Sequence, residues 1–319
     1  MISKQEILDF RTPQNAIFTY SPVVFSVPER QVLLQIKVSA PVKGDNLPII
    51  ILSHGHGQSN HLSSFRGYGP LADFYASQGF VVIQPTHQNS KVLNLDPDNP
   101  EGGLFWLSRA KDIKYILDHL DEIETIVPEL SNRIDKNKIA AVGHSLGGHT
   151  IGMLAGMQVT NPVNGEKINM LDERIKASVL IGIPGDGADV AAPAGGKFPV
   201  LKNNSFTEMT SPALIVYGDE DFSPIFSERK NWRSDAYTMS SGPKSLLTIF
   251  GAQHIFGGIS GYDSNETIKE NPETVADVQR FTLAYILSSL YPENNSWQEI
   301  QKEVEADENP TVSIESKGY

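Results

Sequence analysis

The sequence KIAAVGHSLGGHTIGMLAG, residues 138–156, decides the fold. As far as His144 it is a short apolar run compatible with a buried β-strand, and from Ser145 onward it is rich in small and helix-tolerant residues. Beyond Ser145, apolar side chains recur at a helical spacing on roughly one face. The chain is therefore predicted to turn from strand to helix at Ser145.

Glycines explain how so sharp a turn can form. A serine held between a strand and a helix crowds the residues two positions away, so those residues have to lack a Cβ atom. The pattern Gly143-His144-Ser145-Leu146-Gly147 meets this requirement and is the G-x-S-x-G nucleophile elbow. A Gly-rich turn without chemistry can carry the same pattern, so the strand before Ser145 and the helix after it are what favour a nucleophile.

Composition narrows the classes of function. The 319 residues suffice for a complete core, and 39% apolar with 20% charged residues is ordinary for a globular protein. A net charge of -12 and scattered Lys and Arg residues argue against nucleic acid or an anionic membrane surface as a partner. The absence of cysteine excludes disulfides, a cysteine nucleophile and thiolate metal sites.

The sequence predicts no membrane span and no signal peptide. The first residues lack an apolar core, and the longest apolar runs are too short to cross a bilayer. A cytoplasmic location is the prediction, although an export signal already removed from the chain would leave no trace. The oligomeric state is left open, with a homodimer as one alternative.

Strands alternate with helices, which predicts an α/β fold with one mostly parallel sheet covered by helices on both faces. The two most N-terminal strands, at residues 16–27 and 31–40, should form an antiparallel edge. Further strands are expected at residues 48–52, 80–85, 138–144, 175–183, 212–217 and 245–250. Ligands of such sheets bind at the carboxyl ends of the strands.

Helices and domain boundaries follow from the same pattern. Besides the helix after Ser145, helices are predicted at residues 62–78, 108–127, 224–233 and 271–290. One α/β domain is expected at residues 15–295, with cap-like insertions at about 86–105 and 184–211. Residues 1–14 are expected to form an N-terminal arm, and residues 296–319 a loosely held acidic tail.

A nucleophilic serine needs a base, and in this architecture the order along the chain is serine, acid, histidine. Only His149 and His254 follow Ser145. His149 lies on the same helix and cannot approach the serine from the opposite side, which leaves His254, in a loop just past a predicted strand. A solvent-exposed loop histidine is the alternative, but position and chain order agree with a base.

The acid is expected at the carboxyl end of the strand that precedes the sequence GDED at residues 218–221. Asp221, three residues past the glycine, can project from its loop toward His254. Asp219 is the alternative, but an aspartate in this place commonly stabilises a turn. Asp221 is therefore the predicted acid.

An oxyanion hole requires two backbone N–H groups directed at the developing negative charge. Leu146 supplies one as the residue after the nucleophile, and the turn after the strand at 48–52 supplies the other, from His56. His54, His56 and His61 could instead bind a metal, but they have no helical i, i+4 spacing and no nearby carboxylate. No metal and no cofactor are therefore expected.

Apolar residues near the two insertions are candidates for the substrate pocket. They are Trp106, Phe222, Ile255 and Phe256. These side chains would suit an apolar acyl or aromatic group, while any one of them could be an ordinary core residue. His144, beside the nucleophile, is expected to be packed and hydrogen-bonded rather than to act as a second base.

Five segments make the chain resemble the α/β-hydrolase superfamily over residues 45–290. They are SHGHG at 53–57, QGFVVIQP at 78–85, GHSLGG at 143–148, GDED at 218–221 and GAQH at 251–254. Within the superfamily, the chain is similar to dienelactone-hydrolase-like, chlorophyllase-like and platelet-activating-factor-acetylhydrolase-like serine esterases. The resemblance implies Ser145, Asp221 and His254 as catalytic residues and ester hydrolysis through an acyl-enzyme.

The chain departs from these relatives in two ways. True dienelactone hydrolases use a cysteine in place of Ser145, so their substrate does not carry over. Related secreted polyester hydrolases are typically disulfide-linked, whereas this chain has no cysteine. The prediction is a serine carboxylesterase that acts on small to medium apolar esters, with a small-molecule ester as its partner. Alternatives are an acyltransferase, thioesterase or amidase with the same triad, or a ligand sensor on a hydrolase fold.

Overall fold

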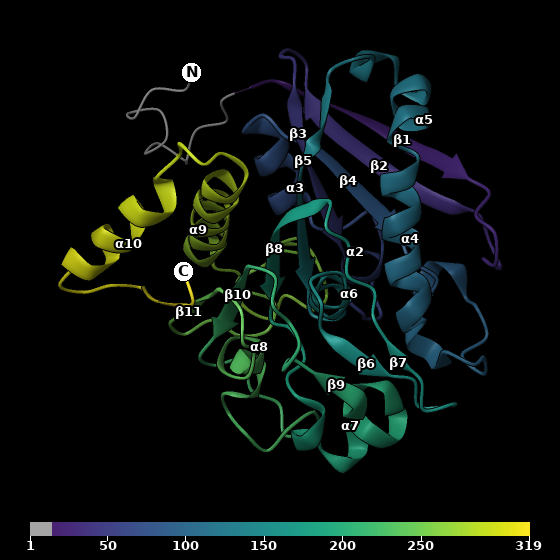
Figure 1. Ribbon diagram of the computed structural model, residues 1–319, viewed down its shortest axis with the longest axis vertical. Helices are drawn as coiled ribbons and strands as arrows, with labels where there is room; N and C mark the ends of the chain where they lie inside the picture. The colour runs from purple at the N-terminus through teal and green to yellow at the C-terminus, as the bar shows by residue number, and fades with distance from the viewer. Residues whose placement is uncertain (1–14) are drawn as a thin grey trace.

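The computed structural model describes residues 15–319, so the predicted N-terminal arm at residues 1–14 lies outside the described residues. Nine strands form one large sheet in the order β1-β2-β4-β3-β5-β8-β10-β11-β12 (Figure 1). All neighbouring pairs from β4 to β11 are parallel. The prediction of an α/β fold with a mostly parallel sheet is therefore confirmed.

Except for β12, the strands overlap the predicted segments. Their bounds are β1 Ile17–Phe25, β2 Leu34–Pro41, β3 Leu47–Ser53, β4 Val81–Thr86, β5 Ile134–His144, β8 Ile175–Ile181, β10 Ala213–Gly218, β11 Lys244–Ile249 and β12 Val312–Lys317. In β3, Ile49 and Ile51 pack into one apolar cluster and Ile50 and Leu52 into the other. Because side chains alternate along a strand, this continuous apolar run belongs to a strand covered on both faces.

Both edges of the sheet are antiparallel. At the N-terminal edge β2 pairs antiparallel with β1, as predicted, and it also pairs antiparallel with β4. Leu34, Ile36 and Val38 of β2 are buried, and Gln35 between them is exposed, which is the alternation of a strand with one solvated face. At the opposite edge β12 pairs antiparallel with β11.

Helices cover both faces of the sheet, as predicted (Figure 1). One face carries α4 (Trp106–Asp118), α5 (Leu120–Ile126) and α6 (Leu146–Leu154), and the other carries α3 (Gly69–Ser77), α9 (Pro272–Leu290) and α10 (Ser296–Ala306). The start of α9 agrees with its sequence signal, because the Asn271 side chain accepts hydrogen bonds from the backbone N–H groups of Glu273 and Thr274.

Two predicted helices are interrupted in the structure. The helix expected at 62–78 is divided into α2 (Asn60–Ser63) and α3. The chain folds back tightly between them, since a Cβ atom on Gly67 would lie 1.6 Å from the His61 carbonyl oxygen. The helix expected at 108–127 breaks into α4 and α5 at His119, whose ring stacks on Tyr115 with the ring centres 3.8 Å apart.

The predicted helix at 224–233 is wrong, because this segment is a loop that ends in the short 3-10 turn η6 (Trp232–Ser234). Its carbonyl groups bind partners elsewhere in the chain. The Phe226 carbonyl accepts the N–H of Ala191, and the Lys230 carbonyl accepts the hydroxyl of Tyr217. These contacts replace the local bonds between turns that a helix needs.

The C-terminal segment also differs from the prediction of a loosely held tail. Residues 296–319 form α10, which packs on α9, and β12, which is an edge strand of the central sheet (Figure 1). Trp297 and Ile300, three residues apart on α10, are buried. The acidic composition hid this apolar stripe, since acidic residues occupy the exposed face of the same helix.

Trp297→Ala is expected to lower the free energy of unfolding by about 3–5 kcal/mol, as for other buried large-to-small substitutions. Trp297 is 6% exposed and packs edge-on against Tyr285, with ring centres 5.4 Å apart. Urea denaturation would measure the change, with the exposed neighbour Gln298→Ala as the matched control. Equal stability of the two variants would show that α10 does not contribute to the core.

The two predicted insertions contain short elements and meet each other. The first contains η1 (Lys91–Leu93) and η2 (Gly102–Leu104), and the second contains η4 (Gly187–Asp189), α7 (Ala192–Lys197), η5 (Pro199–Asn203) and β9 (Asn204–Ser205). Residues 99–104 and 197–200 line a common cavity of about 260 Å³. Strand β9 joins β6 (Gln158–Thr160) and β7 (Lys167–Ile168) in a small second sheet.

The remaining short elements complete the described chain. They are η3 (Pro128–Leu130) before β5 and α8 (Asp235–Thr238) before β11. Within residues 15–319, none of the helices combines the length and the apolar character that crossing a membrane requires.

Candidate active site

Ser145 lies at the carboxyl end of β5, where the chain turns into α6. Its φ of 55° and ψ of -117° are unfavourable for a residue with a side chain. A Cβ atom on Gly143 would lie 2.2 Å from the Gly147 carbonyl oxygen, and one on Gly147 would lie 2.0 Å from the Ser53 carbonyl oxygen. Close backbone approach therefore requires both glycines of the elbow.

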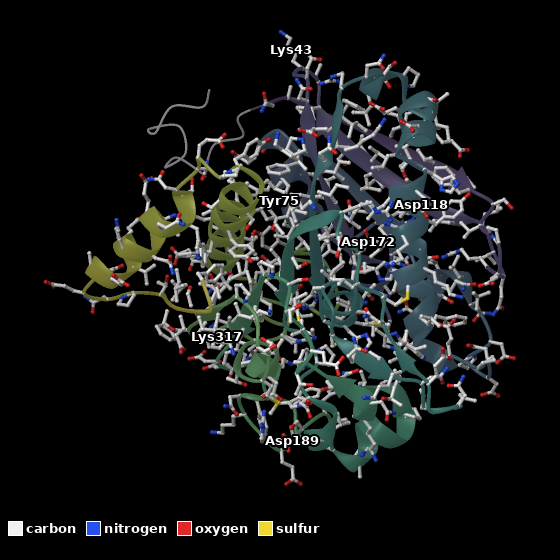
Figure 2. All side chains as sticks on the ribbon, in the orientation of Figure 1. Lys43, Tyr75, Asp118, Asp172, Asp189 and Lys317 are labelled. Atoms are coloured by element: carbon white, nitrogen blue, oxygen red, sulfur yellow. The ribbon has the colours of Figure 1, made fainter. Side chains whose placement is uncertain are left out.

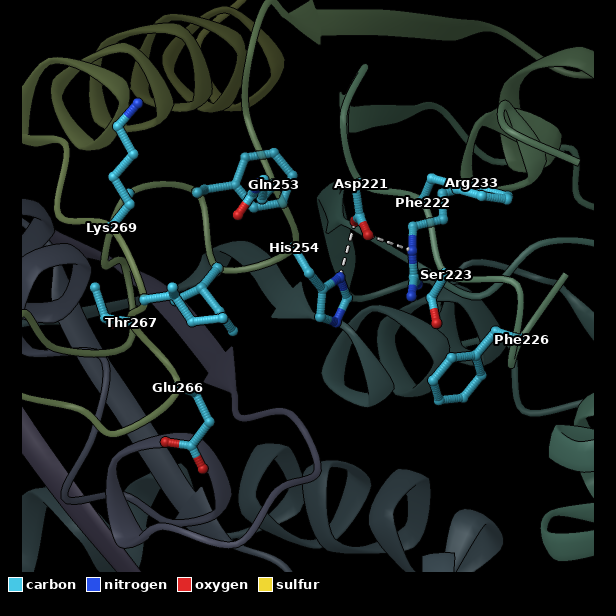
Figure 3. Close-up of a pocket in the computed structure, with 14 residues that line it drawn as sticks. Asp221, Phe222, Ser223, Phe226, Arg233, Gln253, His254, Glu266, Thr267 and Lys269 are labelled. Carbon is cyan, nitrogen blue, oxygen red and sulfur yellow. Dashed lines mark hydrogen bonds and ion pairs between the residues drawn. The ribbon is translucent and has the colours of Figure 1, made fainter. Parts of the chain in front are cut away.

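The structure brings Ser145, His254 and Asp221 into one hydrogen-bonded row. His254 Nε2 is 2.9 Å from Ser145 Oγ, and His254 Nδ1 is 2.8 Å from Asp221 Oδ2. Figure 3 shows the second contact. Since a carboxylate only accepts, Nδ1 carries the imidazole proton, and the lone pair of Nε2 is directed at the serine hydroxyl.

Asp219, the alternative acid, has a different partner. Its carboxylate accepts the backbone N–H of Gly251 at 2.6 Å, which joins two loops. The Asp221 side chain is 2% exposed, whereas the His254 side chain is 31% exposed. The geometry therefore selects Asp221 as the partner of the imidazole and leaves the imidazole accessible.

Arg233 is a site residue that the sequence reasoning missed. Arg233 Nε is 2.8 Å from Asp221 Oδ1, so the two oxygens of this carboxylate are shared between Arg233 and His254 (Figure 3). Burial raises the pKa of Asp221, but the interaction and hydrogen bond with His254 and the positive charge of Arg233 outweigh this effect and lower the pKa to about 2. The carboxylate therefore stays ionised beside the imidazole.

Gly182, at the end of β8, gives the acid and the histidine the space they need. Its φ is 55°, and a Cβ atom there would lie 3.2 Å from Asp221 Oδ2 and 3.3 Å from His254 Nδ1. The Gly182 carbonyl also accepts a hydrogen bond from Arg233 at 2.8 Å. The end of β8 thus shapes the site without contributing a side chain.

The loop at 53–57 packs directly on the elbow, as the prediction of an oxyanion hole requires. A Cβ atom on Gly55 would lie 3.4 Å from the His144 carbonyl oxygen. The backbone N–H groups of His56 and Leu146 find no hydrogen-bond acceptor among residues 15–319. Both predicted donors are therefore free to bind a ligand.

A buried arginine holds this loop in place. Arg109 is 0% exposed, and one of its Nη atoms donates to the His54 carbonyl and, at 3.1 Å, to Ser53 Oγ. Its other nitrogens donate to Asn89 Oδ1 and to Thr150 Oγ1 of α6. One guanidinium group therefore connects the loop at 53–57 with the helix that follows the nucleophile.

A second serine–histidine–aspartate array lies within the same network. His87 Nε2 is 3.0 Å from Ser53 Oγ, and His87 Nδ1 is 2.8 Å from Asp112 Oδ2. Burial, followed by the charges of Arg109 and Arg30, lowers the pKa of His87, so its imidazole is neutral. All three residues of the array are at most 1% exposed, so no substrate can reach Ser53. The array positions the loop.

His144 is packed and hydrogen-bonded, as predicted from the sequence. Its Nδ1 is 2.8 Å from the Tyr68 hydroxyl, and its Nε2 donates to the His254 carbonyl at 2.7 Å. The Tyr68 hydroxyl also accepts the N–H of Gly55 at 3.0 Å. Mainly through burial, the pKa of His144 falls to about 3, so it stays neutral and links the His254 loop to the loop at 53–57.

The histidines considered as a metal cluster have other partners. Both ring nitrogens of His54 are engaged, with the Gly55 carbonyl and with the backbone N–H of His87. His149, the histidine rejected as the base, is buried, and its Nε2 is 2.9 Å from Asn204 Oδ1. In the described part of the chain, no group of three or more His, Cys, Asp and Glu residues is arranged to hold a metal ion.

A cavity of about 420 Å³ lies beside His254. Phe222, Ser223 and Phe226 line it on one side of the imidazole, and Glu266, Thr267 and Lys269 line it on the other (Figure 3). Ile255 and Phe256 also belong to the lining. Three of the four predicted pocket residues therefore line one cavity, of which Phe256 is itself fully buried in the apolar core.

Trp106, the fourth, does not line this cavity. It is 1% exposed and belongs to the apolar cluster under α4. Its position at the start of the helix directs the indole into the core rather than to the carboxyl ends of the strands. The expectation of a pocket residue is wrong here, and the alternative of a core residue applies.

Comparisons with known proteins do not identify the class of this protein, so the class is defined from its structure. No protein-family model matches the chain, and no curated protein matches it. The fold and the site together define an α/β protein with a large, mostly parallel nine-stranded sheet and a hydrogen-bonded Ser–His–Asp row at the turn after β5.

Proposed function

We propose that the chain is a serine hydrolase of the α/β-hydrolase superfamily that cleaves carboxylic esters through an acyl-enzyme. The observation that supports this most directly is the unbroken row from Ser145 Oγ through His254 to Asp221, with both contacts under 3 Å. The strained φ of Ser145 is a second support, since backbone strain of this kind accumulates at functional sites.

The proposed reaction begins when His254 Nε2 accepts the Ser145 proton and Oγ attacks the ester carbonyl carbon. The N–H groups of His56 and Leu146 stabilise the negative charge on the carbonyl oxygen. The intermediate then releases the alkoxide, which takes the proton from His254 and leaves as the alcohol. Water, deprotonated by the same imidazole, attacks the acyl-enzyme and regenerates Ser145 with release of the acid.

Proton transfer to the leaving group defines which part of the substrate occupies the cavity beside His254. The alkoxide has to approach His254 Nε2, so the alcohol part of the ester lies on the side of this cavity. Phe222, Phe226 and Ile255 offer apolar surface there. We therefore propose an ester of an apolar or aromatic alcohol as the substrate.

Reaction with a fluorophosphonate tests this function. The expected result is one adduct per folded chain by intact mass, mapped by peptide fragmentation to Ser145 and absent from heat-denatured protein. Turnover of p-nitrophenyl hexanoate, abolished in the labelled protein, would complete the test. Folded protein that gives neither an adduct nor turnover would contradict the esterase proposal and favour a ligand sensor.

A further inference from the structure

The orientations of Asn89 and His56 follow from their partners. Arg109, which can only donate, contacts Asn89 Oδ1, and this identifies that atom as the amide oxygen. The Asn89 amide nitrogen therefore faces His56 Nδ1, at 3.2 Å, and donates to it. Because an accepting ring nitrogen carries no proton, the proton of neutral His56 lies on Nε2.

This Nε2–H group is a donor in a fixed position. Burial, together with the charges of Arg109, Lys91 and Lys197, lowers the pKa of His56 to about 4, so the ring is neutral at neutral pH. The side chain is only partly buried, and Nε2 has no hydrogen-bond partner in the described chain. Phe198 braces the ring edge-on, with ring centres 5.6 Å apart.

The charges that act on His56 are all positive, although the chain has a net charge of -12. Lys197 Nζ lies 5.1 Å from the centre of the Phe198 ring that braces His56. Lys91 and Lys197 are exposed, and neither forms an ion pair with any residue from 15 to 319. The surroundings of this donor therefore favour an anion.

A cavity of about 260 Å³ borders Phe198, the residue that braces His56, although His56 and Lys91 do not line it. Lys197 and Phe198 line it, together with Glu101. The Glu101 carboxylate is already engaged, because it accepts hydrogen bonds from the N–H groups of Leu107 and Ser108 at the start of α4 and from the Ser108 hydroxyl. It is directed at the start of α4 and forms no ion pair with Lys197.

We propose that the Nε2–H group of His56, with Lys91 and Lys197, forms a subsite for a carboxylate at the far end of the acyl group. The inference rests on the proposed function, in which the backbone N–H of His56 holds the ester carbonyl oxygen. With the alcohol part beside His254, the acyl part is placed on the side of the His56 side chain. The substrate class is then the monoesters of short dicarboxylic acids, so the expected apolar acyl group is replaced by a carboxylate-ended one.

Paired esters of equal chain length test this subsite. We expect the wild-type kcat/KM for p-nitrophenyl hydrogen adipate to exceed that for p-nitrophenyl hexanoate at least about tenfold at low salt, as one charge-assisted hydrogen bond provides. His56→Phe should bring this ratio close to one, whereas His56→Gln, which keeps an N–H donor, should retain part of it. Lys197→Met should lower the ratio and weaken its dependence on salt.

A remote lysine controls for the overall change in charge. Lys43→Met removes the same charge at the amino end of β3, at the top of the molecule in Figure 2, and should leave the ratio unchanged. Using a ratio corrects for any general loss of activity in the His56 variants. A wild-type ratio near one, or an equal ratio in His56→Phe, would overturn the subsite while ester hydrolysis stands. Absence of both turnover and a Ser145 adduct would instead refute the proposed function.

Discussion

Replacing Asp221 with asparagine is expected to lower kcat for ester hydrolysis about 10⁴-fold, with little change in KM. The Asp221 carboxylate accepts the Nδ1 proton of His254 and so leaves Nε2 free to accept the Ser145 proton. The amide group of asparagine would donate to Nδ1 instead, which moves the imidazole proton to Nε2 and removes the base. Steady-state kinetics with p-nitrophenyl hexanoate would measure the loss.

Asp219→Asn is the matched control, since it makes the same chemical change two residues away. The Asp219 carboxylate accepts the N–H of Gly251 and takes no part in the row that contains Ser145. We expect kcat close to that of the wild type in this variant, and thermal unfolding would show that both variants are folded. Similar losses in both variants, or a larger loss in Asp219→Asn, would reject Asp221 as the acid.

The elbow was predictable because its requirements are local. Gly143 and Gly147 stand two residues from Ser145, and the structure shows the close backbone approaches that exclude a Cβ atom at both. The central strands were predictable for a similar reason, since a run such as 48–52 is too apolar for an exposed position. Features of this kind depend on residues that are close in the sequence, so they can be predicted without knowing the tertiary structure.

Long-range contacts could not be predicted in the same way. Arg233 lies in a polar stretch without any motif, and only the folded chain brings it to the Asp221 carboxylate. Strand β12 was missed because the pairing that stabilises it, with β11, joins segments more than sixty residues apart, such as Ile249 and Val312. An edge strand with one solvated face has little apolar content of its own, so its partner decides its structure.

Arg109 and Asp112 are a different case, because a signal for them was present in the sequence. They lie three residues apart in the predicted helix at 108–127, on the same face as the apolar Ile113 and Ile116. Charged residues on the buried face of a helix are costly unless they are hydrogen-bonded there. A polar network under the helix could therefore have been predicted, although its connection with the loop at 53–57 could not.

Replacing Arg109 with glutamine is expected to lower kcat by about 10²- to 10³-fold with a smaller effect on KM, as the loss of one oxyanion donor does. Arg109 does not reach the substrate, but it holds the His54 carbonyl and, through Asn89, the His56 ring on either side of the proposed oxyanion amide. Without these bonds, the His56 N–H is no longer held in its position. Arg109→Lys, which keeps the charge but not the forked geometry, should give an intermediate kcat.

The measurement has to separate a loss of catalysis from a loss of folded protein, because Arg109 is buried. Each buried acceptor that Arg109→Gln leaves without a donor lowers the free energy of unfolding by about 1–3 kcal/mol. Titration with a fluorophosphonate counts competent sites, and kcat is then expressed per titrated site after thermal unfolding has shown a folded chain. Arg280→Gln, which removes a surface ion pair with Glu303, is the control for losing an arginine and should retain wild-type kcat.

Two outcomes of this experiment have different structural meanings. A reduced kcat per titrated site, partly restored by lysine, would show that the buried network sets the geometry of the oxyanion loop as well as supporting the fold. An unchanged kcat per titrated site in Arg109→Gln would contradict this role. The loop at 53–57 would then keep its position through two other hydrogen bonds of the network. These are the bond from the Gly55 N–H to the Tyr68 hydroxyl and the bond from the His87 N–H to His54 Nε2.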